Sequence, residues 1–208
     1  MFGAQFARRS LKRYTTRGLD RIEARMVASA AESPLDGMRV LEIGGGIGKL
    51  QVELLAAGAE QGEVVELLSA YEPYALELAR AKGLEERTTF RVADILEEPG
   101  AVVPGDVVFM NRVVCCSPDG VALTGEAARL TRRVFVLSVP RDVVWMRVAV
   151  GFMNAWFRLI RRSFRVFVHP RAALREAAEV QGLQLADSGR GVAWEFLTFR
   201  RAGVEGRA

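Results

Sequence analysis

A run of glycines between two predicted elements has the composition of a ligand-binding turn. Residues 42–48 read Glu-Ile-Gly-Gly-Gly-Ile-Gly and follow an apolar segment, residues 38–43, that is typical of a buried strand. Glycine has no Cβ and tolerates positive φ, so glycines at alternate positions let the backbone approach a ligand closely. The pattern predicts a small-molecule site at this turn, formed by Glu42, Gly44, Gly45, Gly46 and Gly48.

Two nucleotide-binding motifs compete for this turn. A P-loop requires Gly-x-x-x-x-Gly-Lys-Ser/Thr, but Ile43 stands at the first glycine and Leu50 at the hydroxyl position, which excludes it. A dinucleotide fingerprint requires a third glycine for close helix-to-strand packing, and Lys49 stands there. Lys49 disfavours an NAD(P)-dependent oxidoreductase but leaves that function open as an alternative.

Two acids follow at the ends of the next predicted strands. Glu66 lies in the predicted strand 64–67, 22 residues beyond Gly44. Dinucleotide folds bring an acid onto a ribose at a spacing of about 20 residues. Asp94 closes the predicted strand 89–93. Ligands of open α/β sheets bind beyond the carboxyl ends of the strands, so both acids are expected near the glycine turn.

With these residues in order, the chain resembles the class I S-adenosylmethionine-dependent methyltransferases over roughly residues 38–200. In that family the glycine turn lies under the methionine part of the cofactor, and an acid at the position of Glu66 accepts hydrogen bonds from the ribose. The resemblance implies S-adenosyl-L-methionine as cofactor and an adenine-side acid at Asp94. The other cofactor-side positions that it implies are Leu67, Ile95, Asn111 and Arg112.

The acceptor expected from the sequence is a small, hydrophobic molecule. Methyl transfer from a sulfonium depends on alignment and exclusion of water, so a dedicated base is not required. Nucleic-acid and protein amide methyltransferases of this class often carry Asn-Pro-Pro-Tyr after the fourth strand, whereas residues 111–114 read Asn-Arg-Val-Val. No nucleic-acid substrate is therefore expected, and no metal-ligand set is predicted.

Three residues are candidates for catalysis: His169, Asn111 and Tyr14. His169 is the only histidine and could act as a base near neutral pH, or it could be a capping or packed side chain. The stretch 165–170 around it resembles the corresponding part of magnesium-protoporphyrin O-methyltransferases. Residues 1–37 are expected to form a helical lid over the cofactor, and Tyr14 and Arg17 are the residues whose substitution would test it. The alternative is a surface helix that caps the sheet.

The surrounding elements alternate between strands and helices. This alternation predicts an α/β fold: a Rossmann-like, doubly wound, seven-stranded, mostly parallel sheet with a C-terminal antiparallel hairpin, as one methyltransferase domain over residues 38–208. The predicted strands are 38–43, 64–67, 89–93, 106–110, 134–139, 183–186 and 193–199. Helices are predicted within 6–31 and after the glycine turn, and over 72–82, 122–130, 142–160 and 170–181.

A hydrophobic helical insertion is predicted at about residues 141–168. Its apolar residues recur every three or four positions, so it could roof an acceptor pocket, pack in the core or form a homodimer face. Residues 129–175 contain eleven arginines against the single acid Asp142. This charge distribution is typical of solvated helix faces. It also leaves open peripheral contact with a membrane, and a second alternative function as a non-catalytic binding module for nucleic acid or anionic lipid. Arg147 and Arg158 interrupt the apolar stretch, so no membrane span is expected.

The composition fits a globular protein in a reducing compartment. The chain has 208 residues, half of them apolar, which is enough for a buried core. Cys115 and Cys116 are adjacent, and disulfide geometry disfavours a bridge between neighbours. The N-terminus lacks the apolar run of a secretory signal. A cytoplasmic location is expected.

Overall fold

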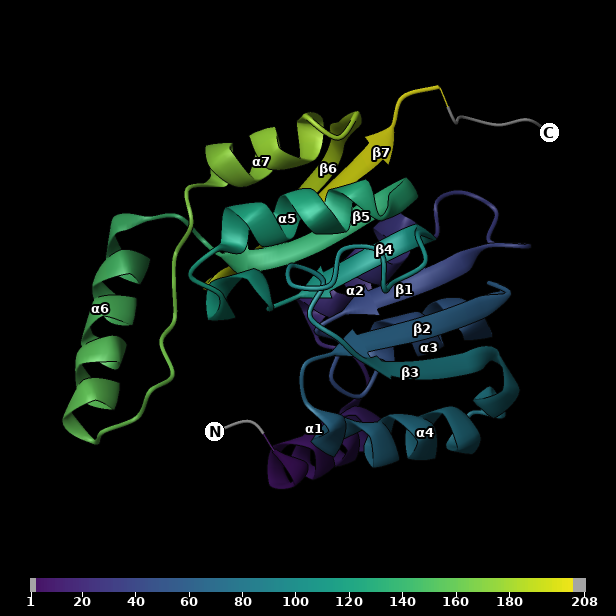
Figure 1. Ribbon diagram of the computed structural model, residues 1–208, viewed down its shortest axis with the longest axis horizontal. Helices are drawn as coiled ribbons and strands as arrows, with labels where there is room; N and C mark the ends of the chain where they lie inside the picture. The colour runs from purple at the N-terminus through teal and green to yellow at the C-terminus, as the bar shows by residue number, and fades with distance from the viewer. Residues whose placement is uncertain (1–2, 204–208) are drawn as a thin grey trace.

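A single sheet organises the chain, of which the computed structural model describes residues 3–203. Within these residues the sheet has seven strands in the order β3-β2-β1-β4-β5-β7-β6 (Figure 1). The strands are β1 (Arg39–Ile43), β2 (Gln61–Glu66), β3 (Thr88–Val92), β4 (Gly105–Asn111), β5 (Thr131–Pro140), β6 (Leu183–Arg190) and β7 (Trp194–Arg201). The predicted fold class is confirmed.

Strand β1 lies at the point where the strand order reverses. The chain continues from β1 to β2 on one side, and β4 lies parallel to β1 on the other. β7 pairs antiparallel with both β5 and β6 and closes the sheet as the expected hairpin. Open α/β sheets bind ligands at such a switch point, beyond the carboxyl ends of the strands. The glycine turn follows β1 directly and therefore lies at that point.

Helices cover both faces of the sheet. Successive strand residues point to opposite faces, so Val40 packs into the core beneath α2, α3 and α4, and Leu41 packs into the core beneath α5 and α7. In Figure 1 α3 lies behind the sheet and α5 in front of it. The helices are α1 (Ala4–Arg17), α2 (Arg21–Ala30), α3 (Lys49–Ala56), α4 (Glu72–Ala81), α5 (Gly120–Arg129), α6 (Val144–Leu159) and α7 (Arg171–Glu179), with short 3-10 turns η1 (Ser69–Tyr71), η2 (Glu85–Arg87) and η3 (Val114–Cys116).

The N-terminal residues form two helices that share the core of the sheet. Gly18, at φ +70°, ends α1, and Asp20 starts α2 by accepting hydrogen bonds from the Ile22 and Glu23 amides. The Glu23 carboxylate in turn accepts from the Asp20 amide, which completes a capping box. Met26 and Ala30 are fully buried in the same core as strand residues.

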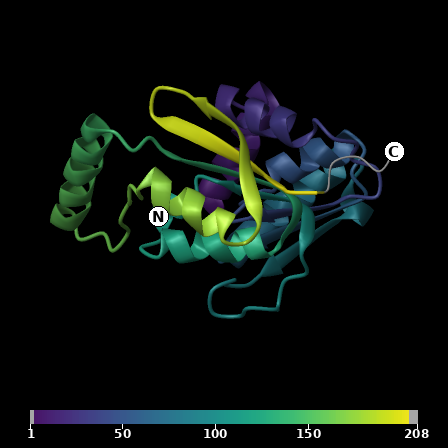
Figure 2. The same ribbon diagram turned by 90° about the horizontal axis from the view of Figure 1, so that it is seen from above.

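The insertion forms α6 and an extended return segment, residues 160–170, which we call the strap. Both views show α6 standing apart from the sheet, beyond the end of β5 (Figures 1 and 2). The Asn154 side-chain amide donates to the Val166 carbonyl at 2.7 Å and accepts from the Val166 amide at 2.9 Å. The Phe167 amide donates to the Cys115 carbonyl at 2.8 Å. The strap therefore joins α6 to the loop after β4.

Predicted strand boundaries were wrong where polar residues occur inside the sheet. β2 begins at Gln61 rather than 64, because the buried Glu63 carboxylate is paired with Arg39 and Arg91 from the flanking strands. β6 extends beyond residue 186 across a register shift between Leu185 and Asp187.

In residues 3–203 no helix has the length and apolar character needed to cross a bilayer.

Candidate functional site

The turn after β1 depends on glycine because of its dihedral angles and its neighbours. Gly44, Gly46 and Gly48 have φ values of +62°, +59° and +71°. A Cβ on Gly44 would lie 2.5 Å from a Val113 methyl carbon, and one on Gly48 would lie 2.5 Å from a Val64 methyl carbon. L-residues with a side chain rarely adopt this conformation, so the sequence fixes the shape of the turn locally.

Glu42 lies beneath the turn and holds the following helix. Its Oε2 accepts hydrogen bonds from the amides of Leu50 and Gln51, at 3.1 and 2.9 Å, in the first turn of α3. A Cβ on Gly45 would lie 2.6 Å from the Glu42 Cγ, so the turn rests on this side chain. Burial raises the pKa of Glu42 to about 7, although the two amides and Lys49 oppose the shift. In this structure Glu42 supports the turn from below.

Glu66 approaches the same turn from the end of β2. Its Oε2 accepts a hydrogen bond from the Gly46 amide at 3.4 Å. Burial raises the pKa of Glu66, opposed by hydrogen bonds from the Gly46 and Leu67 amides. The Leu67 side chain next to it is 62% exposed. The structure thus brings Glu66 to the glycine turn, as the sequence spacing predicted.

Tyr71, in η1, lies beside the glycine turn and was missed by sequence reasoning. The position of a Cβ on Gly46 would lie 3.2 Å from a Tyr71 ring carbon, so the buried ring packs beside the turn. Burial raises the pKa of Tyr71 to about 12, with the nearby Glu66 and Cys116 adding to the shift. The sequence feature that could have identified Tyr71 is its position directly before the predicted helix at 72, five residues after Glu66.

Asp94 lies beside Glu66 at the same edge of the sheet. The Ala93 amide donates to the Glu66 carbonyl at 3.2 Å, which joins the two strand ends. The Asp94 carboxylate accepts from the Leu96 amide at 2.9 Å and so shapes its own loop, while Ile95 is buried. Both acids predicted from the sequence therefore lie at the carboxyl edge of the sheet, and Glu66 contacts the turn.

Asn111 and Arg112, at the end of β4, are engaged with the N-terminal segment and β5. The Asn111 amide donates to Glu23 at 3.0 Å, and its oxygen accepts from the Ser138 hydroxyl at 2.7 Å. Arg112 has φ +60°, and its amide donates to the Ser138 hydroxyl at 3.0 Å. Its guanidinium pairs with Asp20. These side chains fasten α2 to the end of β4.

Lys49 completes this network and explains the residue that replaces the third glycine of a dinucleotide motif. Its ammonium donates to Glu23, whose side chain is only 1% exposed. Burial opposes ionisation of Glu23, but Lys49 and the Asp20 amide outweigh it and hold the pKa of Glu23 below its ordinary value. The first turn of α3 is thereby bound to α2 by a buried ion pair.

Solved structures with this architecture include methyltransferases. Magnesium protoporphyrin IX methyltransferase from Synechocystis PCC 6803, crystallised with bound SAH, is 20% identical, with a TM-score of 0.68 over 87% of this chain and 81% of that chain. The chain has the class I methyltransferase fold. An O-methyltransferase family 2 protein from Planctomyces limnophilus DSM 3776, in complex with apigenin, is 15% identical, with a TM-score of 0.68 over 97% of this chain and 62% of that chain.

The methyltransferase fold by itself does not specify the reaction. The (4+2)-cyclase SpnF also aligns with this chain, at 14% identity and a TM-score of 0.62 over 85% of this chain and 80% of that chain. No protein-family model matches the sequence, and no curated protein matches it. The reaction of this protein is therefore set by its site residues and not by its fold.

Within this methyltransferase fold, Tyr14 lies on the outer side of α3. Its hydroxyl donates to the Glu53 carboxylate, and the ammonium of Lys82, directly after α4, lies 5.7 Å from its ring centre. Burial raises the pKa of Tyr14, and the Glu53 carboxylate raises it further. Arg17 is exposed at the end of α1. Tyr14 therefore attaches α1 to α3 and α4 in this structure.

His169 anchors the strap of this methyltransferase fold. Its Nε2 lies 3.1 Å from the Val114 carbonyl oxygen and 3.0 Å from that of Ser117, so this nitrogen carries a proton and donates. A Cβ on Gly120 would lie 2.4 Å from the same nitrogen, which shows how closely the ring packs on the start of α5. In this structure the ring nitrogen Nε2 is committed to backbone carbonyls.

The two cysteines are free thiols in η3, next to the glycine turn. Their sulfur atoms are 3.9 Å apart, with Cys115 buried and Cys116 exposed. The hydrogen bond with Cys116, together with burial, raises the pKa of Cys115.

Across residues 3–203, no three His, Cys, Asp or Glu side chains are grouped so as to hold a metal ion.

Proposed function

We propose that this protein binds S-adenosyl-L-methionine at the glycine turn and transfers its methyl group to a small, hydrophobic acceptor. The observation that carries the proposal is the Glu66 carboxylate within 3.4 Å of the Gly46 amide, at the point where the strand order reverses. This is where an open α/β sheet binds a nucleotide-like ligand. The solved methyltransferase with bound SAH supports the choice of ligand.

The residues at the carboxyl edge fit the groups of this cofactor. Gly44, Gly45 and Gly46 would lie against its methionine part through their backbone, in a turn whose shape excludes a Cβ at each of the three positions. The half-buried Glu66 carboxylate receives only amide donors from the turn and from Leu67, and two ribose hydroxyls would supply the stronger donors that a carboxylate favours. Asp94 would lie on the adenine side. Glu42, beneath the turn, fixes the position of α3 relative to the turn.

The cofactor, when bound, supplies an electrophilic methyl group on a positively charged sulfur. The protein's contribution is to orient the two reactants and to keep water from between them. We propose that the N-terminal segment, residues 1–37, covers the cofactor edge, because α2 is bound to the end of β4 and to α3 through Glu23. The catalytic domain then comprises residues 38–208 with the insertion at about 141–168.

A small apolar acceptor is supported by the two methyltransferases of this fold. One is named for a magnesium protoporphyrin and the other was solved with apigenin, and both compounds are flat and largely apolar. A catalytic base is not part of the proposal, since His169 donates to two carbonyls and Asn111 is bound at both ends of its amide.

Titration calorimetry with S-adenosylmethionine, S-adenosylhomocysteine and NADH tests the proposal on the full chain. We expect micromolar or tighter binding of the two adenosyl compounds and no heat with NADH. Binding of NADH alone would establish the oxidoreductase alternative. Absence of any adenosyl binding would overturn the proposed function. Binding without methyl transfer to any tested acceptor would overturn the enzymatic part and leave a protein that binds the cofactor.

A further inference from the structure

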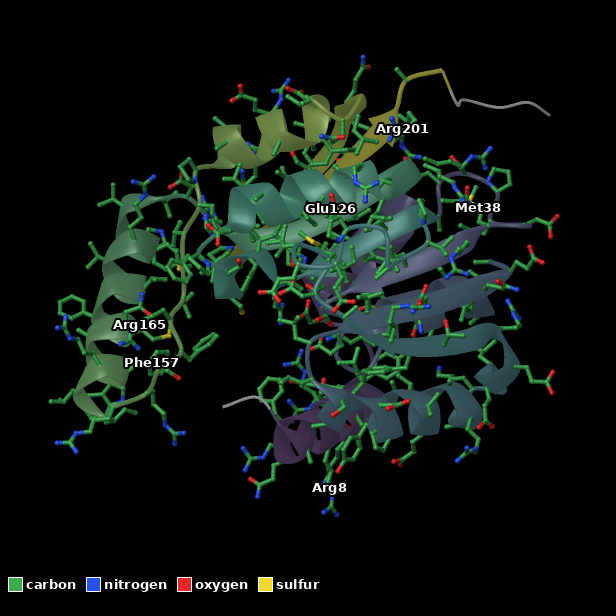
Figure 3. All side chains as sticks on the ribbon, in the orientation of Figure 1. Arg8, Met38, Glu126, Phe157, Arg165 and Arg201 are labelled. Atoms are coloured by element: carbon green, nitrogen blue, oxygen red, sulfur yellow. The ribbon has the colours of Figure 1, made fainter. Side chains whose placement is uncertain are left out.

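Helix α6 exposes an apolar face that nothing in residues 3–203 covers. Val144, Phe152 and Leu159 are 79%, 75% and 74% exposed, and Trp156 is 59% exposed. The opposite side of the helix contacts the strap. Asn154 forms hydrogen bonds with it, and the centres of the Phe157 and Phe164 rings lie 6.0 Å apart. Figure 3 shows Phe157 and Arg165 where the helix and strap meet. The exposed face is therefore a fixed surface of the protein.

The exposed face is continuous along the helix. At about 100° per residue, positions 144, 148, 152, 155 and 159 form one stripe, and positions 145, 149 and 156 lie beside it. All of these are apolar, and together they cover roughly a third of the helix circumference. Arg147 and Arg158 fall at one border of this arc, on its polar side. The helix has the amphipathic pattern of one that lies in a membrane interface.

The charge around this face is cationic. Residues 143–175 contain no aspartate or glutamate. Arg158, Arg161 and Arg162 are exposed, and no acid within residues 3–203 forms an ion pair with them. Arg147 is the exception, because it pairs with Asp142 at 2.6 Å. An apolar arc bordered by Arg158 and followed by Arg161 and Arg162 is complementary to an anionic lipid surface, which offers acyl chains and phosphates together.

A second copy of the chain fits this face less well. A two-fold interface uses the same patch on both partners, so the arginines of two acid-free segments would be brought together. The helix also stands clear of the sheet in both views (Figures 1 and 2). The large side chains of its apolar arc are exposed. These observations favour a lipid surface over self-association.

We propose that α6 docks this protein on an anionic membrane, with Phe152, Trp156 and Leu159 at the acyl boundary and Arg158, Arg161 and Arg162 on lipid phosphates. Strand β5 runs directly into α6, so docking places the carboxyl edge of the sheet, with its glycine turn, on the membrane side. The docking itself is independent of the proposed function. Only its consequence, that the acceptor is taken from the bilayer, depends on methyl transfer.

Vesicle flotation with the full chain tests the docking without any cofactor. We expect binding to vesicles of 70% phosphatidylcholine and 30% phosphatidylglycerol, weaker binding at 0.5 M salt, and little binding to pure phosphatidylcholine. Phe152→Glu/Trp156→Glu should abolish binding. Replacing Arg158, Arg161 and Arg162 by Gln should weaken it on the order of a hundredfold, since each arginine near the surface contributes about fivefold.

The matched control carries two glutamates on exposed apolar residues elsewhere. Val180→Glu/Val192→Glu changes side chains that are 75% and 82% exposed, and it should leave vesicle binding unchanged. Circular dichroism and calorimetry with S-adenosylhomocysteine check that each variant keeps its fold and site. Equal binding to neutral and anionic vesicles, or none to either, overturns the proposal. A dimer in solution that Phe152→Glu/Trp156→Glu dissociates would also overturn it, because a second copy would then occupy the face.

Discussion

The Lys49 ammonium donates to the Glu23 carboxylate across the boundary between α3 and α2, and the carboxylate is almost completely buried. The same carboxylate accepts from Asn111 at the end of β4. One buried acid therefore joins the N-terminal segment, the helix after the glycine turn and the end of β4. The proposed covering of the cofactor edge by the N-terminal segment depends on this contact.

Glu23→Ala should destabilise the protein by about 3 kcal/mol, because it leaves Lys49 facing a buried site without its partner. Glu23→Leu/Lys49→Met should recover most of that loss, since apolar replacement of a buried pair is often neutral. Urea unfolding measures both. Glu85→Ala, which removes an exposed pair with Arg80, serves as the control and should leave stability unchanged. A Glu23→Ala variant as stable as the wild type would show that the pair does not hold α2.

Glu66→Ala should weaken S-adenosylhomocysteine binding by at least about tenfold without unfolding the chain, because a charge-assisted hydrogen bond to the ligand is lost. Glu77→Ala removes the same charge from an exposed position on α4 and should bind normally. Calorimetry gives both affinities. Equal affinity of the two variants for S-adenosylhomocysteine would show that Glu66 does not contact the ligand.

Gly46→Arg should abolish binding, because residue 46 has φ +59° and its Cβ position is 3.2 Å from the Tyr71 ring. Backbone strain alone is tested by Gly83→Arg, since Gly83 has φ +69° and no heavy atom within 4 Å of its Cβ position. That control should lose about 1–2 kcal/mol of stability and keep its affinity. Binding retained by Gly46→Arg would place the ligand elsewhere.

Glu42 should make the stability of the protein fall as pH rises from about 4.5 to 7. Its pKa is raised to about 7 in the folded state from an ordinary 4.5, so the folded state binds the proton more tightly across that interval. The whole effect is on the order of 3 kcal/mol. Asp20 and Glu23, whose pKa values are lowered, act in the opposite direction below that interval.

Urea midpoints between pH 4.5 and 8 measure this dependence. Glu42→Gln should reduce the decline between pH 4.5 and 7 and leave the smaller part that the raised pKa of Glu66 contributes, whereas Glu77→Gln should retain the whole decline. If the curves of the wild type and Glu42→Gln run parallel, the buried carboxyl group does not titrate in this range.

His169→Ala should cost about 1–2 kcal/mol, because it removes the ring donor that the Val114 and Ser117 carbonyls share. Amide exchange of Phe167, which donates to Cys115, should become faster as the strap loosens. Affinity for S-adenosylhomocysteine should stay the same. Gln184→Ala, at an exposed position of β6, is the control. A variant with unchanged exchange at Phe167 would refute the anchoring role of His169.

Residues 42–48, Glu66 and Asp94 could be placed from the sequence because their placement depends on local rules. Glycine dihedral angles fix the turn, and strand ends bring the acids to one edge once the alternation predicts a parallel sheet. Tyr71 was missed because only packing in three dimensions brings its ring beside Gly46. His169 and Tyr14 were candidates by residue type, but their observed partners, Val114, Ser117 and Glu53, are 39 or more residues away in the chain.

By itself the sequence determined the alternation of strands and helices, the glycine turn and the amphipathic period of α6, since each is a pattern among neighbouring residues. Only the tertiary structure decided which side of α6 is covered, that Lys49 meets Glu23, and that Asn111 and Arg112 hold the N-terminal segment. A periodic pattern specifies a face of an element but not what lies against it. That choice is made by contacts between distant residues, which form when the whole chain packs.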